Sequence, residues 1–344
     1  MARYHIGGDV DSRITELAIL GERDQVPKYL RVPTAIPPLR ETLNAIHGYK
    51  IFIIEEGTMA GWLYRNLHSL VDEMIVCDPR RNKLVSEDGD KDNRIDGRKL
   101  AELSRAGMLR KVHHSDNEDR EYLKQWVSLY NDRVRQAVRE TNKLRARCRA
   151  WGLRSPRGAL RNKKVRDPWL KTLHPSLGGQ LRVLFSCLDA VRTQVERCRQ
   201  ELGRRAKAHD IVARWQKHPG IGLIRAATLL AYLDTPFRFS CRNKVWRYCG
   251  IGLQRYATGT DKQGKPKAGR LHLAWAANKR LKAALMGATM SAIHQGNNKI
   301  AEYYQTALRK GVVEGHARHS AVRKLTDRLM AMWKNGSEYD PDKA

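Results

Sequence analysis

The order of hydrophobic patterns in the first hundred residues constrains the fold most. Three short runs typical of β-strands come first, and helical and strand patterns then alternate. The run "KIFIIEE" at 50–56 is continuous and rich in β-branched residues, which is typical of a buried central strand. The expected strands are 3–9, 14–20, 28–34, 50–56 and 72–78, and the expected helices are 37–48, 57–70 and 96–107. The sequence therefore predicts an α/β domain with the order β-β-β-α-β-α-β-α.

Carboxylates stand at the ends of these predicted elements. The order matches a ribonuclease H-like fold, in which the first and fourth strands are neighbours. Asp9 ends the first strand, and Glu55 and Glu56 end the fourth; side-chain alternation lets only one of the two glutamates face the same side as Asp9. Asp92 and Asp96 begin the last helix four residues apart, on one helical face. We assign four further acids to the solvated surface: Asp11, Glu55, Asp88 and Asp90.

Acids that converge in this way would repel one another unless a cation lay among them. Oxygen ligands without nitrogen or sulfur favour Mg²⁺ or Mn²⁺. Such ions assist phosphodiester chemistry, so the sequence predicts a metal site at one edge of the sheet.

The segment from about residue 117 to 209 has a different pattern. Two long stretches carry apolar residues at three- and four-residue steps, which predicts two long helices in an antiparallel coiled-coil arm. Between Arg133 and Lys171 there are 14 Lys and Arg but only two acids, Glu140 and Asp167. This imbalance predicts a phosphate-contacting surface. Its candidate residues are Arg154, Arg157, Arg161, Lys163 and Lys164.

The charge of the whole chain points to a polyanionic partner. There are 65 Lys and Arg against 36 Asp and Glu, a formal net charge of +29. DNA or RNA is the simplest such partner, and we find no apolar run long enough to span a membrane. The six cysteines have no CxxC spacing, which favours reduced thiols in a cytoplasmic protein.

The last third, from about residue 218, is predicted to be mainly helical. It opens with "HPGIG" before an Ala- and Leu-rich helix. Glycines at a helix N-terminus let backbone N–H groups approach a phosphate, so Gly220 and Gly222 are candidate nucleic-acid contacts; a tight helical hairpin is the alternative. The loop "LQRYATGTDKQGK" and the residues after it add basic candidates: Arg255, Lys262, Lys265 and Lys267.

Six blocks resemble, in order, the DEDD-type insertion-sequence transposases related to the Piv DNA invertase. Three are acidic: "GGDVDSR", "IIEEGTMAGWLYRNL" and "KDNRIDGRKLAEL". Three resemble the C-terminal transposase domain of that family: "HPGIGLIRAATLLAYL", "FRFSCRNKVWRYCGIG" and "KLTDRLMAMW". The resemblance implies a RuvC-like domain at 1–112, a coiled-coil and basic arm at 113–212, and a transposase domain at 213–344.

The resemblance also implies a function. The family excises and inserts its own mobile element, and in one branch a non-coding RNA pairs with target and donor DNA. Its RuvC-like acids bind Mg²⁺, and a serine forms a covalent protein–DNA intermediate within a tetramer of two dimers. By motif, the acids fall on Asp9, Glu56 and Asp96. The resemblance thus implies a bacterial, nucleoid-associated DNA recombinase.

Two positions depart from the family pattern. Asn93 stands where a further aspartate is expected, and Asp92 precedes it as a possible replacement. An Asn carbonyl is a poorer Mg²⁺ ligand than a carboxylate. At the nucleophile, Thr258 precedes the glycine, with Thr260 as second choice, because no serine occurs between Ser240 and Ser291.

These departures leave two alternatives open. The chain could be a RuvC-like structure-specific endonuclease that cuts with water. It could also be a catalytically weakened homologue that binds nucleic acid without cutting it.

Overall fold

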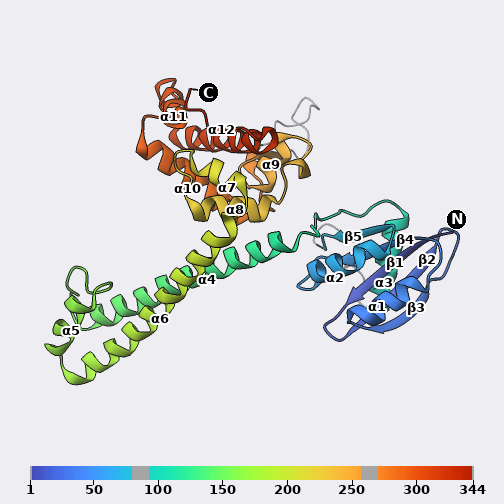
Figure 1. Cartoon of the computed structure of the whole chain (residues 1–344), viewed down its shortest axis with the longest axis horizontal. Coiled ribbons are helices and arrows are strands. Elements are labelled where there is room, and N and C mark those ends of the chain that lie inside the picture. Colours follow the sequence, from blue (N-terminus) through green and yellow to red (C-terminus); the bar gives the residue numbers. More distant parts are fainter. Residues whose placement is uncertain (1, 80–92, 257–269, 343–344) are drawn as a thin grey trace, which may run out of the picture. The chain divides into compact units, whose positions relative to one another are not determined.

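A computed structural model describes residues 2–79, 93–256 and 270–342. The contacts divide the chain into two compact units, residues 1–118 and 119–344 (Figure 1). The first unit is mixed α/β, and the second is mainly helical.

A five-stranded mixed sheet forms the centre of the first unit. The strands are β1 (Arg3–Val10), β2 (Ile14–Gly21), β3 (Lys28–Pro33), β4 (Tyr49–Glu55) and β5 (Glu73–Cys77). Their order is β3-β2-β1-β4-β5, antiparallel from β3 to β1 and parallel from β1 to β5. All five strands were predicted. The predicted neighbourhood of the first and fourth strands is confirmed, with Gly8 opposite Ile54.

Helices cover both faces of this sheet. On one face Ile6, Phe52 and Ile54 pack with leucines of α1 (Ile36–Asn44) and α2 (Ala60–Leu67). A short 3₁₀ turn, η1 (His68–Leu70), follows α2. On the other face Ile51 and Ile53 cluster with Leu100 of α3 (Asn93–Arg105). Strand alternation therefore gives each face its own apolar core.

The contact between β1 and α3 is very close. A Cβ built at Gly7 would lie 2.0 Å from the carbonyl oxygen of Gly97 in α3. Only glycine fits at that point of the strand. This approach places the first turn of α3 beside the carboxyl end of β1.

Two long antiparallel helices begin the second unit, α4 (Glu118–Ala150) and α6 (Pro175–Ala206), side by side in Figure 1. Leu144 and Cys148 of α4 share an apolar cluster with Leu181 and Phe185 of α6. Nearer the other end, Arg133 donates a hydrogen bond to Gln194 over 3.2 Å. The two predicted long helices are confirmed. A short helix, α5 (Lys163–Lys171), lies in the basic segment between them, and the Asn162 side chain caps its first turn.

The remaining elements surround one large core that includes Trp215. They are α7 (Asp210–Gln216), α8 (Leu223–Leu233), η3 (Pro236–Arg238), α9 (Arg242–Tyr248), β6 (Leu253–Tyr256), β7 (Arg270–Leu273), α10 (Lys279–Gln295), α11 (Lys299–Arg309) and α12 (Glu314–Asn335). The predicted helical character is confirmed, while the antiparallel pair β6–β7 was not predicted. The six cysteines are free, and no helix within the described ranges has the length and apolar character needed to cross a membrane.

Candidate functional site

The carboxyl ends of β1 and β4 bring two acids to one edge of the sheet. Asp9 is the last residue but one of β1, and Glu55 is the last residue of β4. By alternation Asp9 shares the face of Gly7, and Glu55 shares the face of Ile53. Gly7 and Ile53 both lie on the face of the sheet that α3 covers. Asp96 lies in the first turn of α3. The fold thus brings Asp9, Glu55 and Asp96 together from three elements.

Burial and mutual repulsion act on these three carboxylates. Burial raises the pKa of Asp9 above its ordinary value, and the charges of Asp96, Asp11 and Glu16 add to the rise. Burial likewise raises the pKa of Glu55, followed by the charges of Asp96 and Asp9. Both residues are partly buried. The site therefore favours a proton or a cation among the acids.

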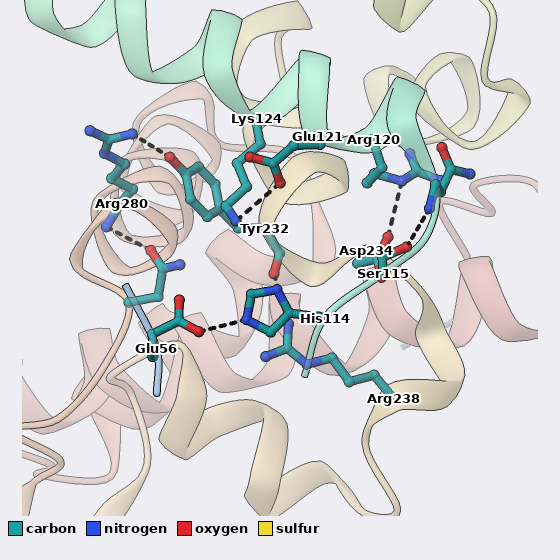
Figure 2. A network of polar contacts seen from close by, with 12 residues as sticks. Glu56, His114, Ser115, Arg120, Glu121, Lys124, Tyr232, Asp234, Arg238 and Arg280 are labelled. Carbon is teal, nitrogen blue, oxygen red and sulfur yellow. Dashed lines mark hydrogen bonds and ion pairs between the residues drawn. The ribbon is translucent and has the colours of Figure 1, made fainter. Parts of the chain in front are cut away.

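Glu56 occupies a different position from Glu55. It lines the same hollow of about 200 Å³ as Asp9 and Glu55. Its carboxylate, however, lies 2.5 Å from Nε2 of His114, as Figure 2 shows. The His114 ring in turn lies 5.6 Å from the ring of Tyr64 in α2. The structure thus groups Glu55 with Asp9 and Asp96, and joins Glu56 to a histidine.

The acidic edge fits a hard cation by its chemistry. Its donors are carboxylate oxygens, which Mg²⁺ and Mn²⁺ prefer. Within the described ranges, no three His, Cys, Asp or Glu side chains lie close enough to hold one ion together. Asp92 and the side chain of Asn93 lie outside the described residues. The metal site and its ligands therefore stay a prediction.

The predicted basic surface of the arm lies at the turn between α4 and α6. Arg154, Arg157, Arg161, Lys163 and Lys164 are all exposed there. Arg166, in the same segment, is buried instead. Its guanidinium forms two hydrogen bonds with Asp189 of α6, at 2.6 and 3.2 Å, and lies 4.5 Å from the ring of Phe185. Arg166 therefore stabilises the end of the arm.

The two glycines of the "HPGIG" turn differ in their surroundings. Gly220 has a φ of 81°, and a Cβ there would lie 2.1 Å from the carbonyl oxygen of Ala288 in α10. The close packing of α10 explains this glycine. Gly222 is the N-cap of α8, is exposed and has open space around it. Phosphate contact by either glycine stays a prediction.

The loop after β6 carries the remaining candidates. Arg255 is exposed on β6. Four candidates fall outside the described residues: Thr258, Lys262, Lys265 and Lys267. Thr260 falls there too.

Part of the second unit matches a known protein family. Residues 213–305 match the Transposase IS116/IS110/IS902 family. The match runs from α7 into α11 and includes the "HPGIG" turn and both short strands. It supports an IS110-type transposase, a transposase or recombinase function, and DNA as the partner. No curated protein matches the chain.

Proposed function

We propose that this protein is a DNA transposase or recombinase that cuts and rejoins strands with the help of Mg²⁺ or Mn²⁺. The observation that carries the proposal is the meeting of three mutually repelling carboxylates in a chain whose residues 213–305 match a transposase family. A basic protein that cuts DNA with metal ions needs such an acidic pocket, because the ions must be held where phosphates also bind.

In this proposal Asp9, Asp96 and a glutamate from the end of β4 move closer together when the cation binds, because their present spacing does not form an ion site. We assign that role to Glu55, because alternation places it on the Asp9 face and its pKa responds to both aspartates. Glu56, the assignment by family motif, would instead orient His114 at the rim of the hollow. When bound, the ion would offset the repulsion among the acids and polarise the scissile phosphodiester.

The nucleophile in this proposal is the hydroxyl of Thr258. Its oxygen forms a bond to phosphorus, and the bond from phosphorus to the leaving sugar oxygen breaks. The hydroxyl proton leaves as that bond forms, and the sugar oxygen takes up a proton. The resulting phosphothreonine ester conserves the energy of the phosphodiester, so the reverse step can rejoin a new strand.

The basic arm would hold nucleic acid in this scheme. Five exposed cations occupy the turn between α4 and α6, where ion pairs are few. The family resemblance implies a non-coding guide RNA and an assembly of dimers or tetramers. A-form RNA is recognised largely through its phosphates and 2′-hydroxyls, which a surface of Arg and Lys suits.

Substitutions of the acids test the acidic site, and Glu55→Gln and Glu56→Gln form a matched pair among them. The purified chain is incubated with labelled element-end DNA and Mg²⁺, and cleavage is followed on a denaturing gel. We expect Asp9→Asn, Asp96→Asn and Glu55→Gln to lower the cleavage rate by at least about 10²-fold, as loss of a charged transition-state contact does. Glu56→Gln should lower the rate much less. If Glu56→Gln is inactive and Glu55→Gln is active, then Glu56 is the metal ligand, as the family motif implies, and the assignment of Glu55 is wrong.

A second experiment tests the covalent step. Denaturation after incubation with DNA and Mg²⁺ should trap a protein–DNA adduct that Thr258→Val abolishes. Cleavage without any adduct would favour the water-using endonuclease. Inactivity of the natural chain, with activity in Asn93→Asp, would identify a nucleic-acid-binding homologue. If the natural chain cuts and Asp92→Ala does not, then Asp92 replaces the expected acid.

A further inference from the structure

A cavity of about 370 Å³ lies in the second unit where α4, α8 and α10 meet. Four of its lining residues are cations: Arg135, Arg225, Lys279 and Arg280. No acid lines it. Its lining residues are separate from the acids of the sheet edge and from the basic turn of the arm.

Neutral acceptors hold two guanidinium groups of this cavity. Arg225 donates hydrogen bonds to the Gly220 carbonyl at 2.6 Å and to the Ser291 hydroxyl at 3.0 Å. Arg280 donates to the Tyr232 hydroxyl, a contact visible in Figure 2. These acceptors are neutral, so they fix the guanidinium groups without neutralising them. Within the described residues Arg225, Lys279 and Arg280 form no ion pair, whereas Arg135 pairs with Asp132.

The ends of two helices add to the positive potential. Arg225 lies in the first turn of α8, and Lys279 and Arg280 lie in the first turn of α10. Helix N-termini carry partial positive charge and ordinarily favour acids. The first turns of α8 and α10 contain no acid. Cations concentrated at this point cost stability unless an anion binds among them.

The remaining lining is mostly apolar. Val134 of α4, Ile224 of α8, and Ala283 and Ala284 of α10 supply methyl groups beside the cations. The volume falls in the range of small-molecule sites, about 300–1,000 Å³, and far exceeds the space of one phosphate group. An occupant must therefore carry both an anionic part and a flat or apolar part.

We infer that this cavity binds one unpaired nucleotide of a single-stranded nucleic acid. The phosphate contacts Arg225, Lys279 and Arg280, and the base lies against the aliphatic side chains. A duplex presents its phosphates outward and keeps its bases stacked inside, so it can place a base in a cavity only at the cost of unpairing and unstacking that base. The inference rests on the proposed function, because strand exchange by a transposase exposes unpaired DNA.

A charge variant tests the phosphate contact. Lys279 is exposed and forms no ion pair with any residue that the structure describes, so Lys279→Gln should leave the fold intact. The matched control is Lys334→Gln on the exposed side of α12, which removes the same charge outside the cavity. Binding of a labelled oligothymidylate to the full chain is measured by fluorescence anisotropy. We expect Lys279→Gln to weaken binding about tenfold, as a lost charge-assisted contact does, and to lower the salt slope by about 0.7.

A size variant tests entry of the base. Ala283→Leu narrows the cavity without a change in charge or much change in helix propensity. Ala331→Leu, at an exposed position of α12, is its control. Single-strand binding should fall about tenfold or more with Ala283→Leu and stay unchanged with Ala331→Leu. Duplex binding should change little in both variants.

The outcomes separate this inference from the proposed function. Equal single-strand affinity in Ala283→Leu and Ala331→Leu would overturn the inference. An equal loss of affinity for duplex and for single strand in Ala283→Leu would overturn it as well. Neither result touches cleavage by the acidic site. Conversely, the natural chain could fail to cleave DNA while it binds single strands in a way that Ala283→Leu weakens and Asp9→Asn does not. That result supports the inference and refutes the proposed function.

Discussion

The contact between Gly7 and α3 makes a sharp test of how the fold builds the acidic edge. A Cβ at Gly7 would lie 2.0 Å from the Gly97 carbonyl oxygen and 2.9 Å from the Ala101 nitrogen. Both are backbone atoms, so no side-chain rotation can relieve the clash. Weak C–H···O contacts have C···O distances of about 3.3–3.6 Å. Gly7→Ala must therefore move α3 away from β1 by roughly 1.5 Å.

The expected cost is at the upper end of overpacking effects, about 3 kcal/mol, because the moved helix also separates Leu100 from the sheet. Hydrogen exchange measured on peptides of β1 and β4 follows the first unit within the full chain. A loss of about 3 kcal/mol should speed exchange of the most protected amides on the order of 100-fold. Cleavage should also fall, because Asp96 moves with α3.

Gly57→Ala is the matched control, since a Cβ there meets nothing within 4 Å. Its exchange should equal that of the natural chain. If Gly7→Ala exchanges as slowly as Gly57→Ala, then α3 does not pack on β1 as described. The grouping of Asp96 with Asp9 would then fail as well.

Three further predictions concern the second unit. Asp189→Asn removes the charge partner of buried Arg166 and should destabilise the arm by about 2 kcal/mol in urea unfolding, whereas Glu196→Gln, at an exposed position of α6, should not shift the transition. Burial lowers the pKa of His218 below its ordinary 6.5, so protonation favours the unfolded chain, and stability present above pH 6.5 should be lost as the pH falls below it. His218→Phe should flatten that dependence in unfolding curves at pH 5 and 7.5, and an unchanged slope would contradict the assignment. Trp215→Phe leaves the Leu329 carbonyl without the indole N–H now 2.9 Å away and opens a cavity, which should lower the free energy of unfolding by about 2–4 kcal/mol in the same assay.

Much of the fold could be read from local patterns. The run "IFII" has the β-branched, continuous apolar character of a buried inner strand, and β4 lies between β1 and β5. The three- and four-residue steps of α4 and α6 identify long helices over many turns, where the pattern is least ambiguous. The strands β6 and β7 are only four residues each, too short for a period of two to stand out.

The candidate site was harder to predict than the fold. Asp9 and Asp96 were identified by their places at the ends of a strand and the start of a helix. Glu55 was assigned to the surface, since the choice between it and Glu56 depends on which face α3 covers. Arg166 was counted among the basic residues of a phosphate-binding surface. Its pairing was not foreseen because its partner, Asp189, lies 23 residues away in the chain.

The strands and the long helices follow from the sequence alone, because periodicity acts within one segment. Charge likewise indicates a polyanionic partner, and position at the ends of elements makes Asp9 and Asp96 candidates. Tertiary structure decided which glutamate meets Asp9, and it alone created the cationic cavity between α4, α8 and α10. The physical reason is the same in both cases. A strand offers two faces and a helix many, and only packing against a distant segment selects the one that is used.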